Sequence, residues 1–254
     1  RFYPRCSGGG QGAVLYSQDS AQCPNMTILS AKLQAVLARI ADAARQYGRG
    51  ASDIRLLAVS KTWPASSVAE LAAAGQRSFG ESYVQEGVDK IALLRELGLE
   101  WHFIGTLQAN KARMVSESFD WVHSVDRLRI AQRLSDRRPS SLPPLSICLQ
   151  VNVSDEATKS GVSLAAAPEL AHAVAALPRL RLRGLMAIPA PSDDFLEQRR
   201  PFRRLRELSE RLKAEGLPFD TLSIGMSHDL EAAIAEGATL VRVGTAIFGE
   251  RITA

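Results

Sequence analysis

The hydrophobic pattern of the chain begins with one amphipathic helix. From Met26 onward, apolar residues recur three or four positions apart and fall on one helical face: Ile28, Leu29, Leu33, Val36, Leu37 and Ile40. Gly48 and Gly50 then provide a typical helix stop. The preceding segment, 1–25, shows neither this periodicity nor the apolar core of a signal peptide. We therefore interpret 1–25 as a leader or an added extension.

After this helix, short apolar runs with the composition of β-strands alternate with segments of helical periodicity. The strand-like runs are 54–60, 77–81, 101–105, 121–125, 145–153, 181–188, 221–225 and 239–245. The helix-like segments between them are 66–74, 83–97, 107–118, 127–137, 164–177, 195–214 and 228–236. Ser82, Asp126 and Ser227 are plausible N-caps for three of these helices.

Regular alternation of this kind predicts a parallel sheet covered by helices. The number of repeats and the chain length favour an α/β fold, a single (β/α)8 TIM barrel over 26–254 with an extra N-terminal helix. A doubly wound open sheet is the alternative, because counting strands does not prove that a sheet closes. The proline-containing loop at 137–145 is too short to separate two domains.

Composition narrows the functional classes. The chain is 46% hydrophobic and 23% charged, which is ordinary for a soluble globular protein, and no apolar run is long enough to span a membrane. Its net charge of +4 permits an anionic small molecule but is too weak to indicate nucleic acid. The densest basic run, Arg199 to Arg206, carries Phe202 and Leu205 at helical spacing, which is typical of the solvent-facing side of an amphipathic helix.

Cysteine and histidine patterns give no sign of a disulfide framework or a metal site. Three cysteines without a CxxC motif fit a reducing cytoplasm best. The four histidines do not show metal-binding spacing. We expect His102 and His123, inside apolar runs, to be core residues and His172 to lie on the surface. His228 directly follows Ser227 and is a candidate for contact with a ligand.

One lysine stands at an unusual place. In the stretch DIRLLAVSKTWP, Lys61 follows a buried strand almost at once and Trp63-Pro64 ends it. An ammonium group is costly to bury, so the simplest interpretation is that Lys61 reaches solvent past the strand end. In a barrel, however, the loops after the strands build the active site. Polar residues and glycines also stand at or just after the ends of several other predicted strands: Glu81, Ser82, Gly105, Thr106, Asn152 and, near one end, the apolar Met186.

The segments SIGMSHD and RVGTAIFG have the composition of a phosphate site. Such sites in barrels are frequently built after the seventh and eighth strands, where glycine allows the backbone to approach an anion. The candidates are Met226 and Ser227 after one strand, and Gly244 and Thr245 after the other. A lysine and a phosphate site together predict a phosphorylated carbonyl ligand, either pyridoxal 5′-phosphate or a sugar phosphate, which the lysine amine would attack.

Arg242 lies within the last predicted strand and could help to choose between these ligands. Its guanidinium stays protonated, so next to a pyridine nitrogen it would discourage protonation there and weaken the cofactor as an electron sink. The alternative for Arg242 is an ion pair in the barrel wall with an acid such as Glu81.

Several ordered motifs resemble the pyridoxal phosphate homeostasis protein family, of YggS/PROSC type. They are LLAVSKTWP, FGESYVQEGVDK, WHFIGTLQANK, SVDR, NVSDEATKSG, RGLMAIP and SIGMSHDLEAAIAEGATLVRVGTAIFG, and they extend over about 30–250. The resemblance implies a barrel like the N-terminal domain of alanine racemase, with pyridoxal 5′-phosphate held as a lysine aldimine. It assigns cofactor-binding positions to Lys61, Ser82, Met226, Ser227, Arg242, Gly244 and Thr245.

Two family motifs are altered here. Ser82 stands where the family commonly has asparagine, so a cofactor contact through this position is in doubt. The family's FIGPLQSNK is FIGTLQANK, with Thr106 and Ala109. Lys159, in TKSG, matches a family lysine of less certain role.

The resemblance implies a carrier or buffer in vitamin B6 homeostasis, with no catalytic residue and no metal. Its expected partners are pyridoxal 5′-phosphate and cofactor-free enzymes that receive it, and we expect a monomer. The alternatives are an amino-acid racemase or a Schiff-base aldolase. Related racemases take a tyrosine from a second domain, whereas this sequence ends shortly after the last predicted strand. Glu81 or Tyr83 would be the acid–base candidates of an aldolase.

Overall fold

The computed structural model describes residues 27–154 and 160–250, so the predicted extension at 1–25 and Lys159 lie outside the described residues. Within these ranges the chain forms nine strands. They are β1 Arg55–Val59, β2 Ser78–Glu81, β3 Glu100–Phe103, β4 Trp121–Val125, β5 Leu145–Asn152, β6 Val162–Ser163, β7 Leu180–Met186, β8 Thr221–Ser223 and β9 Leu240–Val243. All of the predicted strands are present, and the two-residue β6 is additional.

The sheet closes on itself. Its strands follow the order β4-β3-β2-β1-β9-β8-β7-β5, and a further pairing of β4 with β5 joins the two ends. Every pair is parallel, for example Leu57 opposite Arg242 and Gly80 opposite His102. β6 pairs only with β5 and stands outside the ring. The fold is therefore a parallel barrel, and the alternative of an open doubly wound sheet is wrong.

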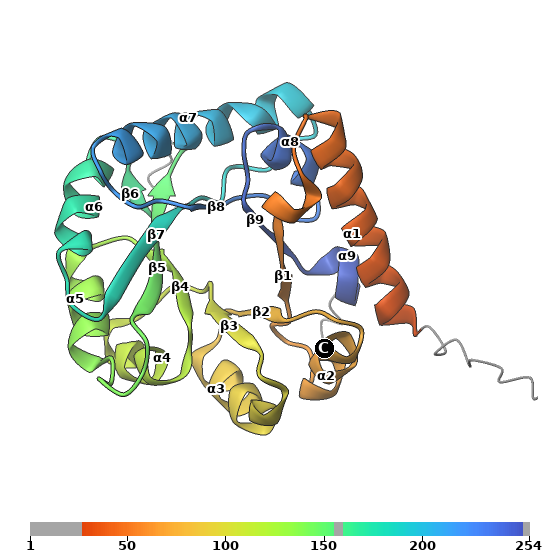
Figure 1. The fold of residues 1–254 in the computed structure, drawn as a ribbon, viewed down its shortest axis with the longest axis horizontal. Coiled ribbons are helices and arrows are strands. Elements are labelled where there is room, and N and C mark those ends of the chain that lie inside the picture. The colour runs from red at the N-terminus through yellow and green to blue at the C-terminus, as the bar shows by residue number, and fades with distance from the viewer. Residues whose placement is uncertain (1–26, 155–159, 251–254) are drawn as a thin grey trace, which may run out of the picture.

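Helices form a ring outside the barrel (Figure 1). They are α1 Ile28–Gln46, α2 Ala65–Ala73, α3 Val84–Leu93, α4 Ala112–Ser118, α5 Leu128–Arg137, α6 Ala167–Ala175, α7 Phe195–Ala214, α8 Leu230–Ala235 and α9 Thr245–Phe248. Three short 3-10 turns, Ala51–Asp53, Arg95–Leu97 and Ala109–Lys111, complete the connections. The extra helix α1 packs against α2, α8 and α9 beside the junction of the first and last strands.

Local signals explain the ends of α1 but not those of three later helices. Thr27 caps α1 by accepting a hydrogen bond from the backbone N–H of Ser30, and Gly48 ends it with φ +66°. The predicted caps Ser82, Asp126 and Ser227 are wrong. The N-cap positions are instead Tyr83, Arg127 and Asp229, none with a capping side-chain bond. A local side-chain cap therefore does not set where these three helices begin.

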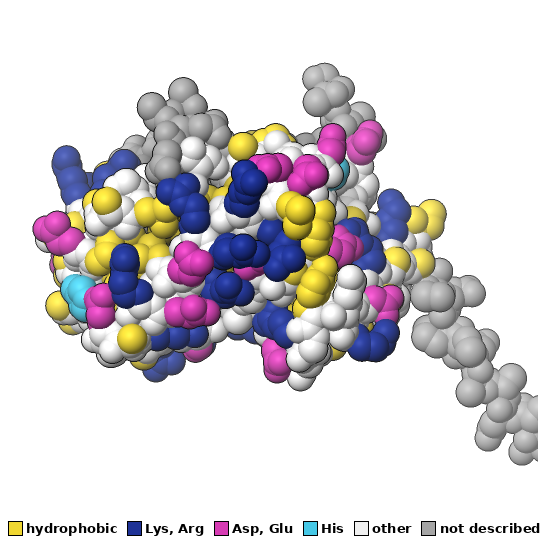
Figure 2. Space-filling view, turned by 90° about the horizontal axis from the view of Figure 1, so that it is seen from above, with side chains coloured by type: hydrophobic (Ala, Val, Ile, Leu, Met, Phe, Trp, Pro, Cys, Tyr) yellow, Lys and Arg dark blue, Asp and Glu magenta, His cyan; other side chains and the backbone are white. Residues whose placement is uncertain are grey.

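The basic run lies on the outer face of α7. Its apolar positions, including Phe202 and Leu205, are fully buried against the barrel. Figure 2 shows arginine and lysine side chains interspersed with acidic ones over the face of the molecule that carries α7. Arg199 and Arg203 both pair with Glu236, whose carboxylate is buried. None of the helices described here is long and apolar enough to cross a membrane.

Candidate functional site

One cavity at the carboxyl ends of the barrel strands collects the predicted site residues. Its volume is about 320 Å³. The described residues that line it are Val59, Lys61, Trp63, Ser82, Ile104, Ile188, Met226, Ser227, His228, Arg242, Gly244, Thr245 and Gly249. All seven residues proposed from the sequence are in this set. Six of them follow the ends of four strands, β1, β2, β8 and β9, and Arg242 lies within β9. The closed barrel brings these strand ends together at one end.

Lys61 lies just past the end of β1, in a turn closed by a hydrogen bond from Trp63 N–H to the Ser60 carbonyl, 3.1 Å. Its side chain is half-buried and lines the cavity. Trp63 packs on Phe248 with the ring centroids 5.7 Å apart, which joins the exit of β1 to α9. The end of the strand thus places Lys61 in the lining of the cavity.

Arg242 is held rigidly at the floor of the cavity. It is only 3% exposed, and its guanidinium donates to Ser223 Oγ at 2.8 Å and to the Ala187 carbonyl at 2.9 Å. Burial lowers its pKa to about 10, so it remains protonated at neutral pH. The predicted alternative, an ion pair with Glu81, is wrong, because Glu81 pairs with Lys90 at 2.8 Å.

The exits of β8 and β9 meet at the other side of the cavity. Ser227 Oγ accepts a hydrogen bond from Ala246 N–H at 3.3 Å, which ties the first exit to α9. Gly244 precedes α9, and a Cβ there would lie 3.3 Å from the Val59 carbonyl oxygen, so glycine keeps this corner narrow. The hydroxyls of Ser227 and Thr245 both line the space.

The charge of the lining fits an anionic ligand. Lys61 and Arg242 supply two cationic side chains, and none of the described lining residues is aspartate or glutamate. His228 also lines the cavity, and its Nε2 lies 2.9 Å from Asp193 Oδ1. An amine, a buried guanidinium and two hydroxyls are the donors that a phosphorylated aldehyde with a ring nitrogen requires, so the residues present fit pyridoxal 5′-phosphate.

Sequence reasoning missed the apolar part of the lining. Trp63, Ile104 and Ile188 follow the ends of β1, β3 and β7 by four, one and two residues. They would be found by considering every residue after these strands and not only the polar ones. Conversely, Asn152 and Met186 are the last residues of β5 and β7 but are not among the described residues that line the cavity. Met186 is fully buried beneath it.

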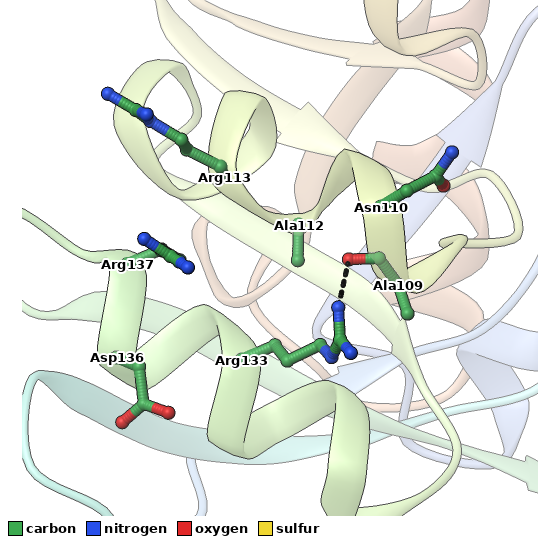
Figure 3. Close-up of a pocket in the computed structure, with 7 residues that line it drawn as sticks. All are labelled: Ala109, Asn110, Ala112, Arg113, Arg133, Asp136 and Arg137. Atoms are coloured by element: carbon green, nitrogen blue, oxygen red, sulfur yellow. Dashed lines mark hydrogen bonds between the residues drawn. The ribbon is translucent and has the colours of Figure 1, made fainter.

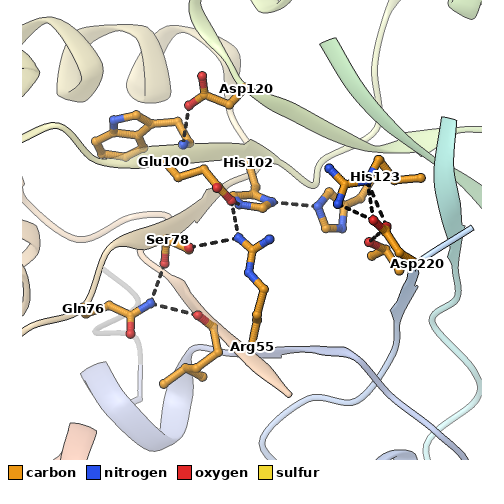
Figure 4. A network of polar contacts seen from close by, with 12 residues as sticks. Arg55, Gln76, Ser78, Glu100, His102, Asp120, His123 and Asp220 are labelled. Carbon is orange, nitrogen blue, oxygen red and sulfur yellow. Dashed lines mark hydrogen bonds and ion pairs between the residues drawn. The ribbon is translucent and has the colours of Figure 1, made fainter. Parts of the chain in front are cut away.

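A chain of polar side chains crosses the barrel core below Arg242. Ser223 Oγ lies 2.9 Å from His123 Nδ1, His123 Nε2 lies 2.8 Å from His102 Nδ1, and His102 Nε2 lies 2.5 Å from Glu100 Oε1. Figure 4 shows its lower part, ending at Glu100 beside Arg55. Since a guanidinium only donates, we assign the hydrogens so that each member donates toward Glu100, with both imidazoles neutral. The two histidines are core residues, as predicted.

Burial lowers the pKa of His102 and lowers the pKa of His123 well below its ordinary value. Unfolded histidine titrates near 6.5, so the unfolded chain takes up protons first as the pH falls, and stability is lost below that pH. We expect the unfolding free energy of the wild type to fall as the pH is lowered from about 6.5 to about 5. The fall should be steeper than that of His123→Gln by about 1.4 kcal/mol per pH unit. Urea unfolding of both proteins across this range measures it. Parallel pH curves would contradict a neutral buried His123.

A second, larger cavity lies outside the barrel, between the segment leading into α4 and helix α5 (Figure 3). Its side chains include Arg113, Arg133 and Arg137, all exposed, and Arg133 donates to the Ala109 carbonyl at 3.2 Å. It contains none of the residues predicted from the sequence. Within the described ranges, no three His, Cys, Asp or Glu side chains come together in a way that could hold a metal ion.

Comparison with known proteins shows the class of protein to which the chain belongs. The family described as "Alanine racemase, N-terminal domain" matches residues 32–252. The alanine racemase of Corynebacterium glutamicum superimposes with a TM-score of 0.67 at 17% identity, covering 90% of this chain and 62% of the racemase. That likeness concerns the fold alone. The barrel and its end-on cavity therefore define a member of the alanine racemase N-terminal domain class.

Closer relatives define the family within this class. The pyridoxal phosphate homeostasis protein of Escherichia coli strain K12 is 58% identical over 229 residues, which cover 89% of this chain and 98% of the relative. PipY of Synechococcus elongatus, solved with pyridoxal phosphate bound, superimposes with a TM-score of 0.77 at 36% identity, covering 87% of this chain and all of PipY. The chain belongs to the pyridoxal phosphate homeostasis protein family.

Proposed function

We propose that this chain binds pyridoxal 5′-phosphate in the cavity at the strand ends, covalently through Lys61, and acts as a carrier or buffer of the cofactor. The observation that carries this proposal is the convergence of Lys61, Arg242, Ser227 and Thr245 on one space without a carboxylate in its described lining. The bound cofactor in PipY and the names of the relatives support it.

Each residue has a distinct part in this proposal. Lys61 supplies the amine that condenses with the cofactor aldehyde, releasing water. The Ser227 and Thr245 hydroxyls would hold the phosphate, and Arg242 would hold the ring nitrogen. When bound, the cofactor offers a reactive aldehyde and a ring that withdraws electrons. Because Arg242 stays protonated, it would keep a neighbouring ring nitrogen unprotonated. This would weaken the electron withdrawal by the ring and would suit storage better than turnover.

The positions of the acid–base candidates favour the carrier over an enzyme. Glu81 is fully buried, and its Oε1 accepts hydrogen bonds from Ser60 and Lys90. Tyr83 is 55% exposed and is not among the described residues that line the cavity. Neither side chain is placed to exchange a proton with a ligand atom there. The Escherichia coli relative at 58% identity carries the name of a homeostasis protein rather than that of an enzyme.

The test begins with the purified protein and pyridoxal 5′-phosphate. We expect a visible absorption band that borohydride removes, with the reduced pyridoxyl mass on Lys61 in the peptide map. The loaded protein should restore activity to a cofactor-free enzyme, and amino acids in deuterated water should show negligible exchange at the α-carbon. Absence of label on Lys61 would refute the binding site. Rapid α-proton exchange would instead support the racemase alternative.

A further inference from the structure

The turn that presents Lys61 is strained. Ser60 to Trp63 form a four-residue turn in which Lys61 occupies the second position and Thr62 the third. Thr62 has φ +70°, a conformation that turns of this type normally give to glycine and that a β-branched residue rarely adopts. Strained backbone persists only where surrounding contacts hold it in place, and it gathers at functional sites. The contacts around this turn therefore show what fixes Lys61.

Two side chains of helix α3 form hydrogen bonds with the turn, one on each side of Lys61. Lys90 Nζ donates to the Ser60 carbonyl at 2.8 Å, which holds the peptide before Lys61. Glu86 Oε1 accepts from Thr62 N–H at 2.5 Å, which holds the peptide after it. The same Lys90 ammonium donates to Glu86 Oε1 at 2.7 Å, so the two side chains that hold the turn are also bonded to each other.

Lys90 is also bonded to a buried carboxylate, that of Glu81, and burying these charges costs free energy. Lys90 is 5% exposed and Glu81 is fully buried. Lys90 uses all three of its donors, on Ser60, Glu81 and Glu86. Glu81 Oε2, by contrast, is buried without a hydrogen-bond partner among the described residues. A buried ion pair is often no more stable than a well-packed apolar pair, so stability alone gives a weak reason for this arrangement.

We infer that Glu81, Lys90 and Glu86 form a clamp that holds the Ser60–Trp63 turn in its strained conformation and so directs the Lys61 amine into the cavity. None of the three is among the described residues lining the cavity, and they act on a ligand only through Lys61. They are positioning residues. The inference rests on the proposed function, since it assumes that Lys61 is the attachment point.

The first measurement needs no cofactor. Amide hydrogen exchange at Thr62 reports whether Glu86 holds this N–H in the folded protein. We expect Glu86→Ala to accelerate that exchange by about tenfold, the loss of one charge-assisted hydrogen bond. Asp89→Ala is the matched control, because Asp89 is an exposed acid of the same helix that contacts Gln85. Equal exchange rates in wild type and Glu86→Ala would overturn the clamp.

The second measurement is the rate at which pyridoxal 5′-phosphate becomes fixed to Lys61, followed by borohydride trapping and mass mapping. We expect Glu86→Ala to slow attachment about tenfold, the lower end of the range for releasing a strained residue. Thr62→Gly in the same background should restore the rate to within about threefold, because glycine adopts this φ without strain. Glu86→Gln keeps an acceptor oxygen, so its attachment rate should lie between those of the wild type and Glu86→Ala.

The outcomes separate the clamp from a purely stabilising ion pair. A stabilising role predicts a lower melting temperature for Glu86→Ala with an unchanged attachment rate in the folded protein and no rescue by Thr62→Gly. That pattern would overturn the inference. If even the wild type fails to label Lys61, the proposed function falls. The Thr62 exchange data would then still decide whether the clamp itself exists.

Discussion

Replacing Lys61 with alanine will abolish covalent attachment of pyridoxal 5′-phosphate to this protein. The amine is the one cavity-lining lysine among the described residues, and its loss leaves only the phosphate and ring contacts. We expect the cofactor affinity to fall about a hundredfold, equivalent to about 2.7 kcal/mol. The fold should stay intact, because Lys61 is half-buried at a strand exit and belongs to no buried cluster. Absorption titration and borohydride trapping measure both effects.

The control for this change is Lys213→Ala. Lys213 is an exposed lysine in the last turn of α7 and lies outside the cavity lining. It should bind and label like the wild type. If Lys61→Ala keeps a borohydride-fixed adduct elsewhere, at the wild-type rate and stoichiometry, the attachment point has been assigned to the wrong lysine.

Gly105→Ala will strongly destabilise the fold. A Cβ at this position would lie 2.1 Å from the Ser82 carbonyl oxygen. That oxygen is a backbone atom and the backbone fixes the place of the Cβ, so no side-chain rotation relieves the contact. Two neighbouring strand exits would have to move apart by about 1 Å, given the normal contact distance between carbon and oxygen. We expect the unfolding free energy to drop by about 3 kcal/mol or more. Urea unfolding measures the loss.

The same substitution should weaken cofactor binding in the protein that remains folded, because Ser82 lines the cavity. Gly48→Ala serves as the control. Gly48 has φ +66°, but nothing lies within 4 Å of the added Cβ, so its cost is conformational and about 1 kcal/mol. A Gly105→Ala protein as stable as Gly48→Ala would show that the two exits separate easily.

The sequence was enough to predict the elements of the barrel because each has a strong local signal. The run around Leu57 is apolar on both faces, as a strand buried on both sides must be, and the face of α1 that carries Leu33 repeats at helical spacing. Closure was not predictable in this way. It depends on the pairing of Trp121 with Ser146, a contact between β4 and β5 that no local pattern encodes.

The residues of the site were also predictable in part. The polar and glycine residues after the strands were found because a barrel places all strand exits at one end, and the family motifs pointed to the same positions. What failed was the choice of partners. Glu81 was considered for Arg242 because both follow or belong to strands, whereas the structure gives Glu81 to Lys90 of a surrounding helix. Lys90 itself resembles an ordinary exposed helix lysine in the sequence, spaced four residues from Glu86.

The hydrogen-bonded chain from Glu100 to Ser223 connects the cavity to the opposite end of the barrel. Glu100 and Arg55 are partly exposed there, where a protein engineer can replace them without touching any cavity-lining residue. Removing the Glu100 charge takes away the anion toward which both imidazoles donate, and Ser223 passes that change to Arg242. We therefore expect a substitution at Glu100 to alter the hydrogen bonding of Arg242 without replacing any residue that lines the cavity.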